Sequence, residues 1–196
     1  MSLPASLTLL FTGVPMSTDA FLSGVSTVAL IRQAGRKILF DTGPYAYRPI
    51  MQKRLERLGV NPQSVDTVVL SHVHWDIAGN VDLFPNADVV LHAKELAFAD
   101  AADGSDSNLP AYTGRALRRL RLRPFEEECD LAEGLRLIEL PGHTPGTIGL
   151  LIGDTLLASD SVPGAAALSA KTGFLAAFDP PSRSRAPPTI PRARAS

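Results

Sequence analysis

The chain has 196 residues, of which 45% are hydrophobic, and this length suggests one domain with enough chain to bury a sizeable core. The formal net charge of −1 gives no basic excess of the kind that nucleic-acid-binding proteins carry, and the single cysteine excludes an internal disulfide and a thiolate metal site. No run approaches the roughly 18 uninterrupted apolar residues of a membrane-spanning helix, so we expect no membrane span.

The predicted elements are short strands with helices between them. No positively charged segment precedes the apolar run at 7–11, which favours a first strand over a signal peptide and predicts a cytoplasmic protein. β-Branched and apolar residues predict strands over 25–31 and 37–40, and near-helical spacing of apolar residues predicts a helix over 48–58. Further strands are expected over 65–70, 87–91, 135–140, 147–152 and 154–158, a helix over about 93–99, and a polar loop over 101–114. This order is typical of an α/β protein with layered sheets.

Two segments late in the chain have an unusual composition. Residues 115–123 carry five arginines, which indicates a helix with a solvated face paired with the acidic residues 126–128, or alternatively a patch for an anionic ligand. Residues 179–196 hold 5 of the 16 prolines and 4 of the 19 basic residues, without hydrophobic periodicity. We therefore expect a domain over 1–178 and a disordered Pro/Arg-rich tail over 179–196. That tail is interpreted either as an interaction segment or as an out-of-frame translation that replaces the original C-terminus.

Histidines and carboxylates follow several of the predicted strands. His72, His74 and Asp76 come after the strand at 65–70, and side chains two residues apart in extended chain project to one side and can converge. His143 lies in a Pro- and Gly-rich turn after another strand, and Asp160 follows a third. Such residues at successive strand ends are the ingredients of a catalytic zinc site with three protein ligands and an open position for water. From spacing alone, solvated loop histidines are an equally good interpretation.

Four motifs occur in a fixed order along the chain: LFDTG at 39–43, SHVHWDIAGN at 71–80, LPGHTPG at 140–146 and SD at 159–160. In this order and separation they resemble the metallo-β-lactamase superfamily over residues 5–165, and within it the lactonase-like hydrolases of the quorum-quenching N-acyl homoserine lactonase type. The resemblance implies an αββα sandwich of two facing sheets, incomplete at the C-terminus of this chain.

The resemblance also assigns roles by position. It implies that His72, His74 and His143 hold a first zinc ion, that Asp76 belongs to a second metal, and that Asp160 bridges or flanks both. Asp41 resembles the structural aspartate beneath the site, where it would orient ligands by hydrogen bonding; capping of its own turn is a compatible alternative.

The chain departs from the family pattern at the second metal. Ile77 stands where the motif H-x-H-x-D-H has its last histidine, and no histidine follows His143. We therefore expect one zinc ion, because Asp76 and Asp160 alone would hold a second only weakly. Other residues near the motifs have two interpretations: His92 is a helix-start or surface histidine or else a substitute metal ligand, and Trp75 is a core residue or a substrate wall.

Three functions are compatible with this pattern. The first is hydrolysis of an ester-like bond (lactone, thioester or amide) in a small-molecule substrate by a zinc-bound hydroxide, with Asp76 accepting the proton of the water. The second is a truncated, catalytically impaired relative that binds metal without turnover. The third is an RNA-processing enzyme of the superfamily, which the near-neutral charge opposes. The sequence does not indicate an oligomeric state.

Overall fold

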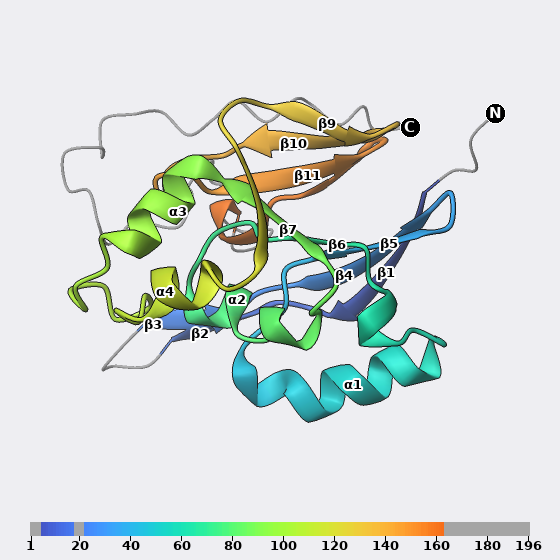
Figure 1. The fold of residues 1–196 in the computed structure, drawn as a ribbon, viewed down its shortest axis with the longest axis horizontal. Helices are drawn as coiled ribbons and strands as arrows, with labels where there is room; N and C mark the ends of the chain where they lie inside the picture. The colour runs from blue at the N-terminus through green and yellow to red at the C-terminus, as the bar shows by residue number, and fades with distance from the viewer. Residues whose placement is uncertain (1–4, 18–21, 163–196) are drawn as a thin grey trace.

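A computed structural model describes residues 5–17 and 22–162 of the chain, with two facing sheets and helices packed along the larger one (Figure 1). The larger sheet has six strands in the order β1-β4-β5-β6-β7-β8, and the smaller has four in the order β12-β11-β10-β9. The short strands β2 (Val14–Ser17) and β3 (Leu22–Val25) form a separate antiparallel pair. The predicted class of layered α/β protein is thus confirmed for the described residues.

The six-stranded sheet is antiparallel at one side and parallel at the other. β1 (Ser6–Phe11), β4 (Val28–Gln33) and β5 (Arg36–Phe40) pair antiparallel. The remaining strands pair parallel to β5 and to one another; they are β6 (Thr67–Val69), β7 (Asp88–His92) and β8 (Arg121–Phe125). Because parallel strands end at the same edge of a sheet, the segments that follow β5, β6 and β7 meet there.

The four-stranded sheet is antiparallel throughout and contributes a second set of loops to that edge. Its strands are β9 (Cys129–Ala132), β10 (Leu135–Glu139), β11 (Ile148–Ile152) and β12 (Thr155–Leu157). The β10–β11 loop carries His143, and the 3-10 turn η4 (Ser159–Ser161) after β12 carries Asp160. A backbone hydrogen bond of 2.9 Å from Ile148 N to Ser71 O joins the two sheets next to the site.

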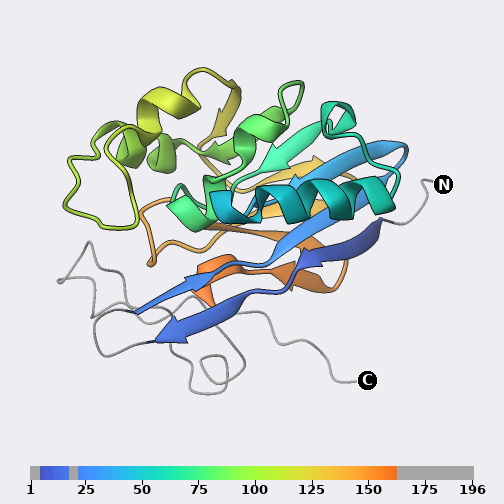
Figure 2. The same cartoon turned by 90° about the horizontal axis from the view of Figure 1, so that it is seen from below.

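The helices lie along the larger sheet. They are α1 (Arg48–Arg57), α2 (Trp75–Ala78), α3 (Ala93–Asp100) and α4 (Thr113–Leu117), with 3-10 turns at η1 (Tyr45–Tyr47), η2 (Pro62–Ser64) and η3 (Val81–Leu83). In Figure 2, α1 crosses in front of the six-stranded sheet, with the four-stranded sheet behind it. Met51 and Leu55 of α1 are fully buried against the six-stranded sheet.

Alternation along the central strands divides the core into two layers. In β4, Val28 and Leu30 face the helices, whereas Ala29 and Ile31 face the four-stranded sheet. All four side chains are buried, which explains why this strand is a continuous apolar run rather than an alternating one.

Several predicted boundaries are wrong. The strand predicted over 25–31 is the end of β3 followed by β4. The arginine-rich run is not one helix: α4 ends at Leu117, and β8 begins at Arg121 because that segment pairs with β7. Three of its five arginines form ion pairs, Arg118 with Asp100 and both Arg121 and Arg123 with Asp88, rather than with the acidic residues 126–128. The expected domain end at 178 and the tail at 179–196 lie outside the described residues.

Candidate metal centre

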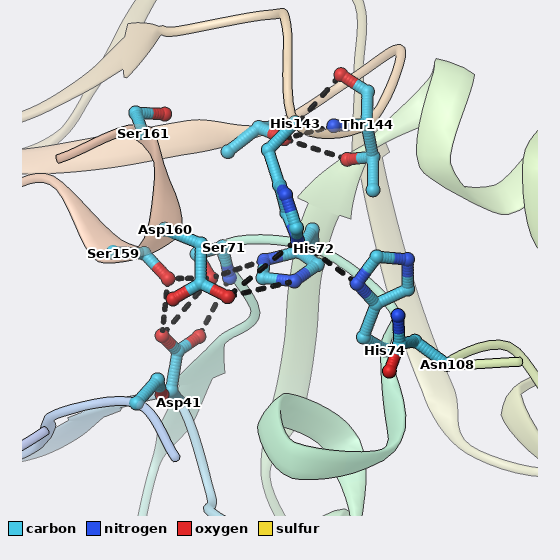
Figure 3. Close-up of polar contacts among 12 residues, drawn as sticks. Asp41, Ser71, His72, His74, Asn108, His143, Thr144, Ser159, Asp160 and Ser161 are labelled. Carbon is cyan, nitrogen blue, oxygen red and sulfur yellow. Dashed lines mark hydrogen bonds and ion pairs between the residues drawn. The ribbon is translucent and has the colours of Figure 1, made fainter. Parts of the chain in front are cut away.

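Three histidine rings meet where the loops of the two sheets come together (Figure 3). His72 and His74 follow β6, and His143 comes from the β10–β11 loop of the other sheet. The ring centroids are 4.7–4.8 Å apart and the ring planes stand at 84–86° to one another. Each ring therefore presents an edge to the same small volume, as ligands of a single ion must.

The nitrogen atoms that face this volume can be identified from their neighbours. His143 Nε2 lies 3.0 Å from His74 Nδ1 and 3.5 Å from an Asp160 carboxylate oxygen. His72 Nε2 is buried, lies 3.9 Å from the same oxygen, and has no hydrogen-bond partner among the described residues. A buried polar atom without a partner is costly unless something else satisfies it. A cation in the common volume would do so, and the three histidines therefore fit a metal ion.

Burial makes these imidazoles suitable ligands. His72, His74 and His143 are 0%, 4% and 9% exposed. Burial, together with the neighbouring histidines, lowers the pKa of His72 well below its ordinary value, and burial likewise lowers the pKa of His143 to about 3. Both rings are consequently neutral at physiological pH and offer lone pairs to a metal ion.

Asp106, which the sequence analysis missed, fixes the orientation of His74. Its Oδ2 atom lies 3.1 Å from His74 Nε2, and its Oδ1 atom accepts the Asn108 N–H at 2.8 Å. The hydrogen bond with His74 lowers the pKa of Asp106, so the group is an ionised carboxylate that can only accept. Nε2 therefore carries the hydrogen of His74, and Nδ1 keeps its lone pair toward the cluster.

Asp41 lies beneath the cluster in a buried hydrogen-bond network. Its two oxygens accept the Ser71 N–H at 2.7 Å and the Ser71 hydroxyl at 2.9 Å, and Ser159 Oγ lies 3.3 Å away. The same Ser71 hydroxyl is 3.1 Å from His72 Nδ1. Asp41 is fully buried and has a φ of 59°, a strained value for a residue other than glycine. The structure thus places Asp41 where it contacts His72 through Ser71.

Two further carboxylates reach the cluster. Asp76 lies in the first turn of α2 and Asp160 lies in η4, and each brings an oxygen to within 4.8 Å of the other and of a ring nitrogen of His72. Burial raises the pKa of Asp76 to about 7, and the charge of Asp160 adds to that rise. Burial also raises the pKa of Asp160. A cation between two close, buried carboxyl groups would stabilise their ionised forms, which burial and mutual repulsion otherwise disfavour.

Among the described residues, no other histidine takes the place of the missing second-metal histidine. The Ile77 side chain is fully buried in the helix-side core. His92 is the N-cap of α3: its Nδ1 accepts the Lys94 N–H at 3.0 Å and its Nε2 lies 3.1 Å from the Glu126 carbonyl oxygen. The interpretation of His92 as a helix-start residue is therefore confirmed, and it belongs to neither group of metal-capable residues found in the described part of the chain.

The interpretation of Trp75 as a core residue is wrong. Its side chain is 37% exposed, and the indole N–H donates to Asn108 Oδ1 at 3.3 Å. It thus holds the 101–114 loop beside the histidines rather than filling the core.

No helix among the described residues is long and apolar enough to span a membrane.

Known proteins share this fold. The structure of an N-acyl homoserine lactone hydrolase, determined with the product N-hexanoyl-L-homoserine at its catalytic metal centre, matches with a TM-score of 0.61 at 19% identity. The match covers 78% of this chain and 71% of that one. At this identity the likeness concerns the fold alone, and it confirms the predicted sandwich of two facing sheets.

Sequence comparisons identify the same family. An N-acyl homoserine lactonase of Agrobacterium fabrum is 31% identical over 52% of this chain, and one of a Bacillus species is 32% identical over 50%. The chain spans about two fifths of the length of these relatives, 40% and 37% respectively. The family model described as "Metallo-beta-lactamase superfamily" matches residues 23–182. Together with the histidine cluster at the junction of two sheets, this match shows that the chain belongs to the metallo-β-lactamase superfamily.

Proposed function

We propose that this chain is a metal-dependent hydrolase that cleaves an ester-like bond, such as a lactone, thioester or amide, in a small-molecule substrate. The observation that carries the proposal is the meeting of three buried histidines from two different sheets, with the Nε2 atom of His72 unsatisfied among the described residues. The names of the lactonase relatives support the lactone as the first substrate to test. The net charge of −1 favours a small molecule over a nucleic acid.

We assign His72, His74 and His143 as the ligands of one zinc ion. Three histidine ligands with an open fourth position are a common zinc site, in which the ion lowers the pKa of water to about 7 and polarises a carbonyl. Asp106 and Ser71 hold two of these rings in place through the nitrogens that face away from the cluster. One ion is proposed because the second group adds only two carboxylates to the shared His72.

Asp76 is the proposed proton acceptor. It is 6% exposed and close to the ligand His72, so it is shielded from bulk water yet adjacent to the reacting groups. A cation nearby would counteract the effects that raise the pKa of this carboxyl to about 7 and would keep it ionised at neutral pH. Asp76 can then take a proton from the attacking water and pass it to the leaving group, while Asp160 orients that water by hydrogen bonding.

The first prediction tests metal binding and turnover together. We expect the purified chain to hold about one zinc ion, measured by elemental analysis, and to hydrolyse at least one of a lactone, a thioester and an amide. His143→Asn should lose both properties because one ligand is gone. His92→Asn is the matched control: it changes a buried histidine outside the metal group, and asparagine can still cap α3.

The outcomes separate the competing functions. Zinc binding without hydrolysis of any of the three substrates would favour a chain that binds metal without turnover. Absence of zinc from the wild-type chain after loading would contradict the assignment of the three ligands. Equal loss in His92→Asn and His143→Asn would mean that the effect is one of folding rather than of ligation.

A further inference from the structure

A fully buried glutamate contacts both loops that carry the metal ligands. Glu95 lies in the first turn of α3 and is 0% exposed. Its Oε2 atom accepts the Val73 N–H at 3.1 Å, and its Oε1 atom accepts the Gly146 N–H at 2.7 Å. Val73 stands between His72 and His74, and Gly146 follows His143 by three residues. One carboxylate therefore connects the backbone of both ligand-bearing segments.

Burial and hydrogen bonding act on the Glu95 carboxyl in opposite directions. Burial raises its pKa, but hydrogen bonds from Thr144 and Gly146 act in the opposite direction. An ionised carboxylate only accepts hydrogen bonds, and backbone N–H groups from both loops point at its two oxygens. Such charge-assisted bonds are stronger than neutral ones and offset part of the cost of taking the charge out of water, but burial is the larger effect and the pKa of Glu95 is raised overall.

The fit between the His143 loop and α3 leaves no room for a side chain at the contact. A Cβ atom added at Gly146 would lie 2.9 Å from Glu95 N and 3.1 Å from Glu95 Cγ. The first of these atoms is backbone, so either the loop or the helix would have to shift. The bare Gly146 backbone thus allows the short bond to Glu95.

We propose that Glu95 is a positioning residue: its carboxylate holds the 72–74 segment and the His143 loop in the relative position that lets the three histidines share one ion. The inference rests on the proposed metal site and deepens it. An ionised Glu95 would contribute in a second way, because a buried negative charge against the two ligand-bearing segments compensates the charge of a divalent cation.

Another connection between these segments limits the expected effect. The backbone bond from Ile148 N to Ser71 O persists whatever residue stands at position 95. Loss of the Glu95 bonds should therefore not separate the loops but should allow the rings to depart from ligating geometry. Loss of a group that orients metal ligands typically reduces metal affinity about 10–100-fold, and we expect a reduction in this range.

The test compares Glu95→Gln with a matched control on the full chain. Glutamine keeps the size of the side chain but turns an N–H₂ group toward one of the two N–H donors. Asp66→Asn removes a carboxylate just before β6 that also accepts a backbone N–H, from Lys37 of β5 at 2.7 Å, and that belongs to neither group of metal-capable residues in the described part of the chain. The readouts are the Zn²⁺ dissociation constant from chelator competition, the visible spectrum of the Co²⁺-loaded chain, and the unfolding temperature of the metal-free chain.

We expect Glu95→Gln to weaken Zn²⁺ binding about 10–100-fold and to change the Co²⁺ bands, whereas Asp66→Asn leaves both as in the wild type. Gly146→Ala approaches the same contact from the other loop and should weaken binding as well, which keeps the test decisive if Glu95→Gln fails to fold. Glu95→Asp, which restores the charge, should recover part of the affinity.

The positioning role of Glu95 is contradicted if folded Glu95→Gln and Gly146→Ala bind Zn²⁺ and give Co²⁺ spectra as the wild type does. It is also contradicted if Asp66→Asn weakens binding to the same extent, because the effect would then be one of general stability. A wild-type chain that binds neither ion would instead overturn the proposed function, and this inference with it.

Discussion

Asp76 illustrates how a single residue of the site opposes folding. Its carboxyl is buried beside Asp160, and burial together with that neighbour raises its pKa from 3.8 to about 7. The folded chain therefore binds this proton more tightly than the unfolded chain does. The contribution of the protonated Asp76 carboxyl to the free energy of unfolding is fully present at pH values below the unfolded pKa and is lost as the pH rises through the folded pKa. In the metal-free chain, ionised Asp76 is thus a cost at pH 8.

Replacement of Asp76 by asparagine should consequently raise stability and lower function. We expect metal-free Asp76→Asn to be more stable than the wild type at pH 8 and the difference to be smaller at pH 5, where the wild-type carboxyl is protonated in the folded state. Urea unfolding at the two pH values measures this difference. Asp154→Asn, an exposed position in the β11–β12 turn, controls for the loss of one negative charge. A difference that does not widen from pH 5 to pH 8 would contradict the raised pKa, and undiminished turnover would contradict the proposed role.

The site residues that the sequence predicts well are histidines and carboxylates that directly follow predicted strands. Three of the four histidines follow strand ends in short motifs, and the structure brings His72, His74 and His143 together with Asp76 and Asp160. Glu95 and Asp106 could not be found in this way. One lies in an ordinary helical segment and the other in a polar loop, and their partners are 22 to 51 residues distant in sequence. Only the folded chain shows that they contact the ligand segments.

Among the elements, β4 shows why the fold class was predictable and the exact boundaries were not. Its apolar run indicated a buried strand, and the structure buries both of its faces. The arginine-rich segment gave no such signal, because β8 is an edge strand that forms through pairing with β7 rather than through its own apolar residues. Pairing with a neighbour overrides local preference in such a segment.

Burial on both faces makes β4 sensitive to substitution. Leu30 is 0% exposed in the helix-side layer, so Leu30→Ala should reduce the free energy of unfolding by about 2–5 kcal/mol through lost burial and the cavity left behind. Leu9→Ala on the neighbouring strand β1 is the matched control, since Leu9 is 51% exposed and should cost much less. Chemical denaturation of both variants measures the difference. Equal costs at the two positions would contradict the described packing of the sheet.

At the scale of the whole molecule, the candidate metal centre joins the two sheets. His72 and His74 belong to loops of the six-stranded sheet and His143 to a loop of the four-stranded sheet, so an ion bound to all three would cross-link the layers. Asp41 with Ser159, and Glu95 with Gly146, bridge the same boundary by hydrogen bonds. The site and the packing of the sheets are therefore coupled, and whatever binds the site should stabilise the entire fold.

That coupling predicts a large thermal effect of metal. An ion that binds only the folded chain, at about a thousand times its dissociation constant, adds about 4 kcal/mol to the free energy of unfolding. For a chain of this size such a gain corresponds to a rise of roughly 8–16 °C in the unfolding temperature. We expect Zn²⁺ to give a rise of this order in calorimetry and a chelator to reverse it. His143→Asn should abolish most of the rise, because the ion would then contact only one sheet through histidine, whereas His92→Asn should retain it. A wild-type chain whose unfolding temperature does not respond to Zn²⁺ would show that these three histidines do not share an ion.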